Sequence, residues 1–211
     1  MLKTPWILRK EGQKEAYQYF DRHIRSLPKD KNGHIDKKLA KLSNNDVDAF
    51  RHAYTSGIIV QEYKNSFIAD ILGQANEIFR PNNPKEQVNM DLWNNAIGRK
   101  YGKETTSRKE LADKLKKALE NGELIISPKD PRKYKEDNYK IDPLNSVVVI
   151  KESDKGRNEI FLDLKTEQIM TREEFVVQIN SGSYPGYTVA MIEHLPTPKS
   201  KPDDSPLNNL G

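Results

Sequence analysis

The sequence predicts an α+β fold, in which a mainly α-helical body of about six helices precedes a small C-terminal antiparallel β-β-α-β unit. Apolar residues recur at three- and four-residue spacing through residues 1–121, which is the periodicity of amphipathic helices. Short β-branched runs separated by turn residues follow toward the C-terminal end. The 211 residues are enough for one core with a small appended unit.

The helices of the predicted body are bounded by recognisable start and stop residues. Pro28 ends the first helix, and Ser43 and Asp46 have the spacing of a capping box that opens the third. Gly102 and Gly122 stand where the fifth and sixth helices should end, because glycine is common just after a helix C-terminus. The predicted helices cover residues 11–27, 36–42, 46–63, 66–79, 86–101 and 107–121.

The C-terminal unit is predicted from strand patterns and one helix cap. Two β-branched runs, residues 147–150 and 160–162, flank a polar turn that is typical of a hairpin. Thr171 and Glu174 form a capping box for a helix, and a strand is expected over residues 188–192. The predicted division of the chain is a helical body carrying the site at 1–127, a loop or linker at 128–143, the β-β-α-β unit at 144–195 and an extended tail at 196–211.

The composition limits the classes of function. Without cysteine the chain has no disulfide framework, thiolate zinc site or cysteine nucleophile. Its 35 basic and 31 acidic residues are interleaved as on a solvated surface, so we see no strong nucleic-acid signal. No apolar run approaches the roughly 18 residues of a transmembrane helix. The N-terminal residues lack the features of a signal peptide, so we expect a cytoplasmic protein, or one exported by a specialised secretion system.

The predicted helix over residues 86–101 has an unusual polar pattern. Two apolar stripes leave Asn89 and Lys100 on one side, as an ordinary solvent-facing pair. The stripe on the other side then faces inward, and it contains Gln87, Asp91, Asn94, Asn95 and Gly98. Buried carboxylates and amides need hydrogen-bond partners or a metal. A glycine in that stripe permits the close approach of another backbone or of a ligand.

Two further helices carry similar polar lines. Glu77 is aligned with Asp70 on the predicted helix over residues 66–79. Asp48 and His52 share one face of the helix over residues 46–63, although this helix taken alone favours a solvated i,i+4 pair.

The functional interpretation brings these lines together in a cleft. The expected catalytic residues are His52, Asp48, Glu77 and Asp91, and the same four would hold a divalent metal such as Zn, Mn or Mg. The expected substrate-binding residues are Arg51, Asn94, Asn95 and Arg99. Without a metal, His52 would be a general base oriented by Asp48, and an arginine would hold an anionic group. The alternative is a buried polar network that only fixes helix packing.

Three motifs in this order resemble those of an uncharacterised bacterial domain family that is associated with phage-encoded and toxin- or effector-like proteins. They are D-A-F-R-H at 48–52, A-N-E at 75–77 and M-D-L-W-N-N-A-I-G-R at 90–99. The resemblance implies that Asp48, Arg51, His52, Glu77, Asp91, Asn94, Asn95 and Arg99 are the functional positions, and it implies no particular reaction. The family pattern has histidine before the glutamate, where this chain has Asn76, so a metal site would have one strong ligand fewer.

These observations favour a bacterial hydrolase or a toxin- or effector-like enzyme, acting on a phosphodiester, lipid or cell-wall substrate that the sequence does not identify. The rival interpretation is a non-enzymatic interaction protein, whose polar stripes are structural and whose C-terminal unit binds a protein partner.

Overall fold

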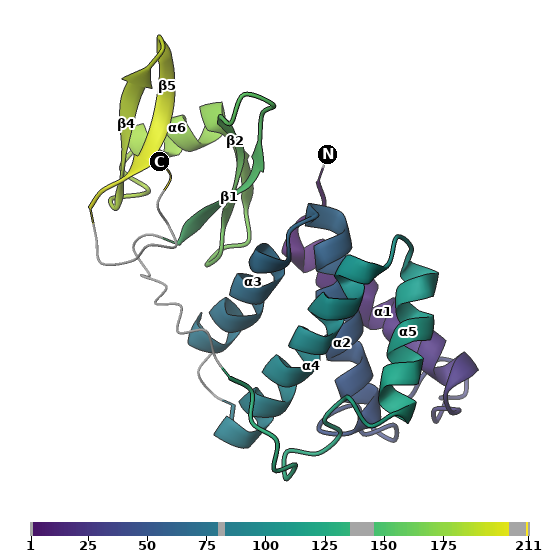
Figure 1. Cartoon of the computed structure of the whole chain (residues 1–211). Helices are drawn as coiled ribbons and strands as arrows, with labels where there is room; N and C mark the ends of the chain where they lie inside the picture. Colours follow the sequence, from purple (N-terminus) through teal and green to yellow (C-terminus); the bar gives the residue numbers. More distant parts are fainter. Residues whose placement is uncertain (1, 80–82, 136–145, 203–209, 211) are drawn as a thin grey trace. The chain divides into compact units, whose positions relative to one another are not determined.

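The computed structural model describes residues 2–79, 83–135, 146–202 and 210, with the side chains of residues 76–79 left outside the description. The chain divides into two compact units, Met1–Lys135 and Glu136–Gly211. The described residues form six helices and five antiparallel strands, with the strands toward the C-terminus (Figure 1), which confirms the α+β prediction. Within these residues no helix combines the length and apolar character needed to cross a membrane.

The first unit is built around one central helix. α2 packs against each of the other four helices of the unit, and most of its residues are buried. Figure 1 shows α4 and α3 on one side of it and α1 and α5 on the other. The helices are α1 (Pro5–His23), α2 (Asp46–Tyr63), α3 (Ser66–Phe79), α4 (Lys85–Glu104) and α5 (Arg108–Glu120).

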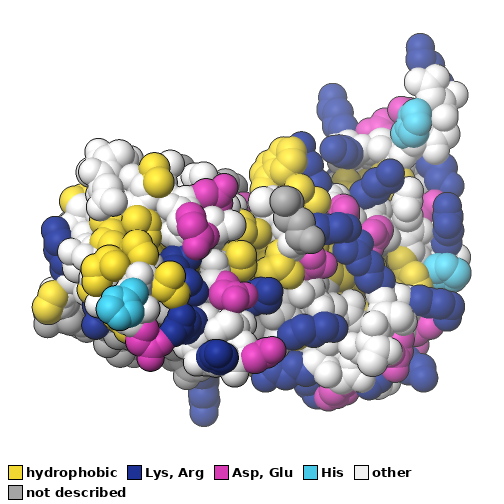
Figure 2. Space-filling view, turned by 90° about the horizontal axis from the view of Figure 1, so that it is seen from above, with side chains coloured by type: hydrophobic (Ala, Val, Ile, Leu, Met, Phe, Trp, Pro, Cys, Tyr) yellow, Lys and Arg dark blue, Asp and Glu magenta, His cyan; other side chains and the backbone are white. Residues whose placement is uncertain are grey.

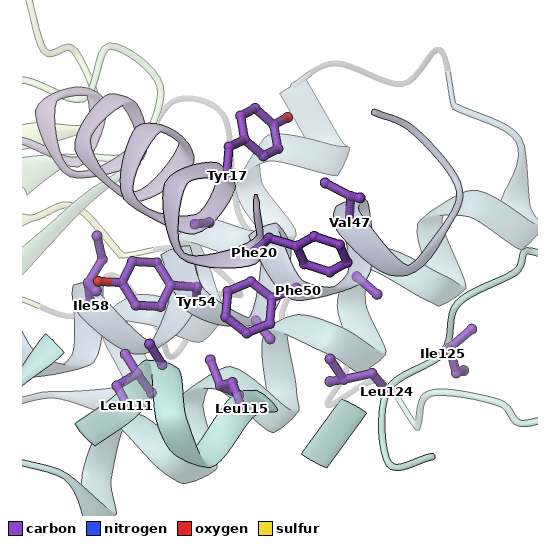
Figure 3. Close-up of a cluster of buried hydrophobic side chains, with 14 of the residues drawn as sticks. Tyr17, Phe20, Val47, Phe50, Tyr54, Ile58, Leu111, Leu115, Leu124 and Ile125 are labelled. Carbon is purple, nitrogen blue, oxygen red and sulfur yellow. The ribbon is translucent and has the colours of Figure 1, made fainter. Parts of the chain in front are cut away.

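Aromatic side chains fill the centre of the first unit (Figure 3). Phe50 of α2 stacks on Tyr54 with ring centroids 6.1 Å apart, and Phe20 of α1 meets Phe50 edge-on at 5.8 Å. Leu111 and Leu115 of α5 complete this cluster and are fully buried. Each such side chain contributes about 1.5–3 kcal/mol of stability through burial.

Two glycines of α4 allow it to lie directly against α2. A Cβ at Gly98 would overlap the carbonyl oxygen of Ala53, and one at Gly102 would lie 2.7 Å from the carbonyl oxygen of Gly57. Of the two alternatives predicted for Gly98, the close approach of another backbone or of a ligand, the structure shows the first. The prediction that Gly102 follows the helix end is wrong, because α4 continues to Glu104 and packs on α2 through this glycine.

Side chains near the first two helices explain where the predicted bounds were wrong. α1 begins at Pro5 instead of residue 11, because Thr4 caps it and proline suits the first turn. The predicted helix over residues 36–42 is a series of turns, in which the Asp36 carboxylate accepts hydrogen bonds from the backbone N–H groups of residues 38 and 39. Asn45, instead of Ser43, caps α2 by accepting from the N–H of Asp48.

The second unit contains two small sheets and one helix. β1 (Val147–Glu152), β2 (Asn158–Asp163) and β3 (Ile169–Thr171) form an antiparallel sheet in that order, and β4 (Tyr187–Ile192) pairs with β5 (Leu195–Ser200). α6 (Arg172–Asn180) starts at the predicted capping box of Thr171 and Glu174, which is confirmed. Phe161, Phe175 and Tyr187 form the centre of this unit's core.

The sequence missed two strands of this unit. β3 is only three residues long, too short for an alternating pattern to stand out. β5 occupies part of the predicted tail although it contains Pro196 and Pro198. Prolines are accepted there because a strand of a two-stranded sheet needs only one of its edges for pairing. Residues 136–143 of the predicted linker and 203–209 of the predicted tail lie outside the described residues.

Candidate metal centre and adjoining pocket

Three potential metal ligands from two helices meet in the first unit. His52 Nε2 of α2 lies 3.2 Å from Asp91 Oδ1 of α4 and 3.7 Å from Asp48 Oδ1. The three ligand atoms lie within 4.8 Å of one another. Asp48 and His52 share a face because they are four residues apart on α2. The structure thus brings together three of the four predicted metal ligands.

The first turn of α2 holds Asp48 in place. Its backbone N–H donates to the Asn45 side chain at 3.1 Å, and its Oδ2 accepts from the backbone N–H of Asn44 at 2.7 Å. A carboxylate is also favoured near a helix N-terminus, where the unpaired N–H groups carry partial positive charge. Asp48 is 5% exposed and Asp91 is 8% exposed, so both carboxylates need compensating positive charge or hydrogen bonds.

The environment of His52 favours the neutral imidazole. Burial lowers the pKa of His52 well below its usual value, and the nearby charge of Arg51 lowers this pKa further. The charge of Asp48 and a hydrogen bond with the side chain of Asn95 act in the opposite direction. The neutral form is the one that binds metal ions.

Arg51 already provides one positive charge at this centre. Its Nη2 lies 2.5 Å from Asp48 Oδ1 and 2.5 Å from His52 Nε2, and its Nε lies 3.1 Å from the same Asp48 oxygen. An arginine can only donate, so His52 Nε2 accepts and carries no proton. The guanidinium therefore faces the same two lone pairs that a metal ion would use.

The centre opens into a pocket of about 370 Å³ between α1, α2, α3 and α4. His52 and Asp91 form part of its wall, together with Arg51 and Asn95 from the predicted set. The remaining lining residues are Trp6, Arg9, Lys10, Gln13, Thr55, Ser56, Ile59, Ala69, Leu72, Gly73 and Asn83. A pocket of this volume is of the size that binds small ligands.

Asn94 and Arg99, expected to bind substrate, do not line this pocket. Asn94 is fully buried and exchanges two hydrogen bonds with the backbone of Ile125. Arg99 forms a buried ion pair with Asp70 at 3.0 Å and donates to the Tyr134 hydroxyl at 3.0 Å. Asn94 thus holds the segment after α5 against α4, and Arg99 joins α4 to α3. Because both side chains have these structural partners, we do not include them in the site.

Glu77, the fourth predicted ligand, belongs to α3, but its side chain lies outside the described residues, as does that of Asn76.

Several pocket residues were not singled out by sequence reasoning. Ser56 follows His52 by one helical turn, and its side chain is 4% exposed with no hydrogen-bond partner for Oγ in the described part of the chain. Thr55 Oγ1, which lies against Gly12 of α1, also has no hydrogen-bond partner in the described part of the chain. The i,i+4 spacing from His52 was the available sequence signal for Ser56. Residues Arg9 and Lys10 could not be found this way, because they reach the pocket only through the packing of α1 on α2.

Comparison with known proteins gives one family match. A family model described as a domain of unknown function (DUF6973) matches residues 25–123, which include Asp48, His52 and Asp91 and end before the second unit. The match is consistent with the resemblance to an uncharacterised domain family. Searches of curated proteins and of solved structures found no match for the chain.

Proposed function

We propose that the first unit is a hydrolase-type enzyme, which binds a divalent cation at Asp48, His52 and Asp91 and its substrate in the adjoining pocket. The observation that carries this proposal is the convergence of three ligand atoms from α2 and α4, two of which, those of His52 and Asp91, belong to residues that line that pocket. A solvated surface pair on α2, the plainer interpretation of its polar face, would not be covered by another helix.

The donor set fits a divalent cation. Zinc bonds of about 2.1 Å in tetrahedral geometry separate neighbouring ligand atoms by about 3.4 Å. The 3.2 Å and 3.7 Å separations around His52 Nε2 lie on either side of that value. One imidazole and two carboxylates are ligands that suit zinc and manganese, and carboxylates also bind magnesium. Catalytic zinc sites commonly use three protein ligands.

A bound cation would supply Lewis-acid chemistry for hydrolysis. The protein itself positions the ligand side chains and keeps them in the protonation state that binds a cation. Asn44 and Asn45 fix the Asp48 carboxylate and its helical turn, and burial keeps His52 neutral. Asn95 lines the pocket together with His52, and its side chain raises the pKa of His52 against the effect of burial. The lowered pKa of His52 makes it a weak base, so the metal-free version with His52 as general base is less well supported.

A non-enzymatic role is the second candidate, and two observations favour it. Arg51 neutralises Asp48 without any metal, as in a purely structural network. In the second unit, the β4–β5 hairpin exposes apolar side chains that would suit a protein partner: Met191 (67% exposed), Ile192 (42%) and Leu195 (38%). Figure 2 shows apolar side chains gathered on part of the visible surface, while Lys and Arg lie among Asp and Glu.

Elemental analysis and hydrolase assays separate the two candidates. Protein purified without added metal, then dialysed against Zn²⁺, Mn²⁺ or Mg²⁺, should retain one equivalent of one of them. His52→Ala and Asp91→Asn should lose it, whereas the matched surface variants His23→Ala and Asp113→Asn should keep it. Bis(p-nitrophenyl) phosphate and p-nitrophenyl esters then test for hydrolysis. The enzyme proposal fails if no cation is retained and the two site variants leave every measured activity intact.

Expression in bacteria tests the toxin- or effector-like part of the proposal. The wild-type chain, directed to the cytoplasm or to the periplasm, should inhibit growth in one of these compartments, and His52→Ala should abolish the inhibition. If cells grow equally well with the wild-type chain and with His52→Ala in both compartments, the toxin- or effector-like role is excluded.

A further inference from the structure

The charges that line the pocket are mostly positive. Arg9 and Lys10 of α1 and Arg51 of α2 contribute three cationic side chains, while Asp91 is the one carboxylate among the described lining residues. Lys10 lies over the ring of Trp6 at 3.9 Å from the centroid, and within the described residues it has no carboxylate partner. A cation bound at the metal centre would offset the charge of Asp48 and Asp91. Among the described lining residues, cationic side chains would then outnumber uncompensated carboxylates.

Arg51 connects the metal centre to the pocket. Its Nη2 faces Asp48 Oδ1 and His52 Nε2, which are two of the three proposed ligand atoms. A divalent cation and this nitrogen cannot use the same lone pairs at once. A cation bound at this centre would therefore displace the guanidinium of Arg51, whose side chain is 25% exposed and lines the pocket. A planar guanidinium with its donors freed matches the oxygens of phosphate in a bidentate arrangement.

Two buried hydroxyls point to a polar ligand in the same pocket. Ser56 Oγ and Thr55 Oγ1 line it and have no hydrogen-bond partner in the described part of the chain. Ser56 is 4% exposed, so its hydroxyl costs free energy when it is unpaired, unless a bound ligand forms a hydrogen bond with it. Hydroxyls beside cationic side chains are typical donors to phosphate oxygens.

We infer that the pocket binds a phosphate group through Arg51, Arg9 and Lys10, and that cation and phosphate bind with positive coupling because the cation releases Arg51 from Asp48 and His52. This deepens the proposed function by naming its substrate class as a phosphate ester. The coupling rests on the proposed cation centre. The anion subsite itself rests on the lining charges and the unpaired hydroxyls.

Titration calorimetry on the full chain tests the inference with inorganic phosphate and Mn²⁺ as probes. Phosphate should bind about tenfold more tightly in the presence of saturating Mn²⁺, and Mn²⁺ should gain the same factor from phosphate. Acetate should not reproduce this gain. Lys10→Met should weaken phosphate binding about tenfold, while Lys14→Met, one turn further along the exposed side of α1, should have little effect. Equal effects of the two lysine variants would overturn the subsite.

Arg51→Met gives the sharper outcome, because the two affinities should change in opposite directions. Mn²⁺ should bind more tightly once the competing guanidinium is gone, and phosphate should bind at least about tenfold more weakly. A purely structural arginine would lower both affinities or neither, and either result would overturn the role assigned to it. If Arg51→Met does not fold, the lysine pair still decides the subsite.

The outcomes for the two proposals are distinguishable. Mn²⁺ binding without phosphate binding would overturn this inference and leave the cation centre standing. Phosphate binding that Lys10→Met weakens, in a chain that retains no cation, would overturn the cation centre and the coupling and leave the anion subsite. Nitrophenyl phosphate and vesicles containing an anionic phospholipid, used in place of inorganic phosphate, distinguish a soluble ester from a lipid headgroup as its source.

Discussion

The side chain of Asn94 and the backbone of Ile125 exchange two hydrogen bonds, with Nδ2 donating to the Ile125 carbonyl at 2.8 Å and Oδ1 accepting from its N–H at 2.9 Å. This pair ties the segment after α5 to α4, in the interior of the first unit. The Trp93 indole also donates to a backbone carbonyl of this segment, that of Glu123.

Asn94→Ala should destabilise the protein without affecting the pocket. The substitution leaves a buried N–H and a buried carbonyl without partners, at about 1–3 kcal/mol for each unsatisfied group. We expect a loss of about 2–4 kcal/mol in urea unfolding. Cation and phosphate affinities, measured well below the unfolding transition, should be unchanged. If the variant is stable but binds cation or phosphate less well, Asn94 is part of the binding site after all.

Gly98→Ala should be strongly destabilising, because the added Cβ would overlap the carbonyl oxygen of Ala53 and push α4 away from α2. Gly73→Ala is the matched control on a neighbouring helix, since its Cβ would meet only the flexible end of Asn95 at 3.3 Å. Replacing glycine by alanine in a helix otherwise gains about 1 kcal/mol. We expect unfolding free energy to fall by several kcal/mol for Gly98→Ala, in the range of about 3–5 kcal/mol, and to change little or rise for Gly73→Ala.

Ser56→Ala should separate stability from ligand binding. Removing a buried hydroxyl that lacks a partner should leave the unfolding free energy unchanged or raise it by about 1 kcal/mol. Phosphate affinity should fall, because a donor of the pocket is lost. A marked loss of stability in thermal melts would mean that Ser56 Oγ serves the protein's own packing instead.

Cation binding should appear as a shift in melting temperature. A cation at one hundred times its Kd stabilises the folded chain by about 2.7 kcal/mol, and a chelator should reverse the shift. His52→Ala should abolish the dependence on cation concentration, whereas His23→Ala should retain it. Equal shifts in both variants would place the bound cation elsewhere.

The ion pair of Arg25 with Asp46 at the start of α2 should make stability depend on acidity. The hydrogen bond from Arg25 lowers the pKa of Asp46 below its usual value. This stabilisation is therefore fully present above the unfolded-state pKa of about 3.9 and is lost as the pH falls through the lower folded-state pKa. Because both side chains are partly exposed, its size should be about 1 kcal/mol or less.

Urea unfolding of the wild type and Asp46→Asn at pH 7 and pH 2.5 measures this effect. Asparagine keeps the shape of the side chain but cannot ionise. The wild type should be the more stable at pH 7, and the difference should narrow at the lower pH. If the difference in unfolding free energy between wild type and variant is the same at both pH values, the ion pair is not its origin.

The sequence predicted Asp91 as an inward residue more securely than Asp48 and His52. On α4 two apolar stripes must both be buried, and the polar stripe with Asp91 lies between them on the inward side. On α2 there is one apolar face, so the opposite polar face could lie in solvent. The structure resolves the ambiguity, since α4 covers the polar side of α2 next to Asp48 and His52. The periodicity of α2 alone does not show which other helix packs against its polar side.

Asn94 and Asn95 illustrate the same limit at the level of single residues. They are adjacent in one polar stripe, and the sequence assigned both to the substrate. A turn of about 100° between them sends one amide to the backbone of Ile125 and the other to His52 and the pocket. Which of the two faces a ligand depends on where the segment after α5 runs.

By itself, the sequence determined the fold class, the caps at Ser107 and Thr171, the extent of α3 and the close approach at Gly98. These follow from local rules of periodicity, capping and side-chain size, which act within a few residues of the chain. Only the tertiary structure decided that His52 meets Asp91 and that α1 brings Lys10 to the pocket. Those contacts join residues far apart in sequence, and they depend on how the helices pack around α2.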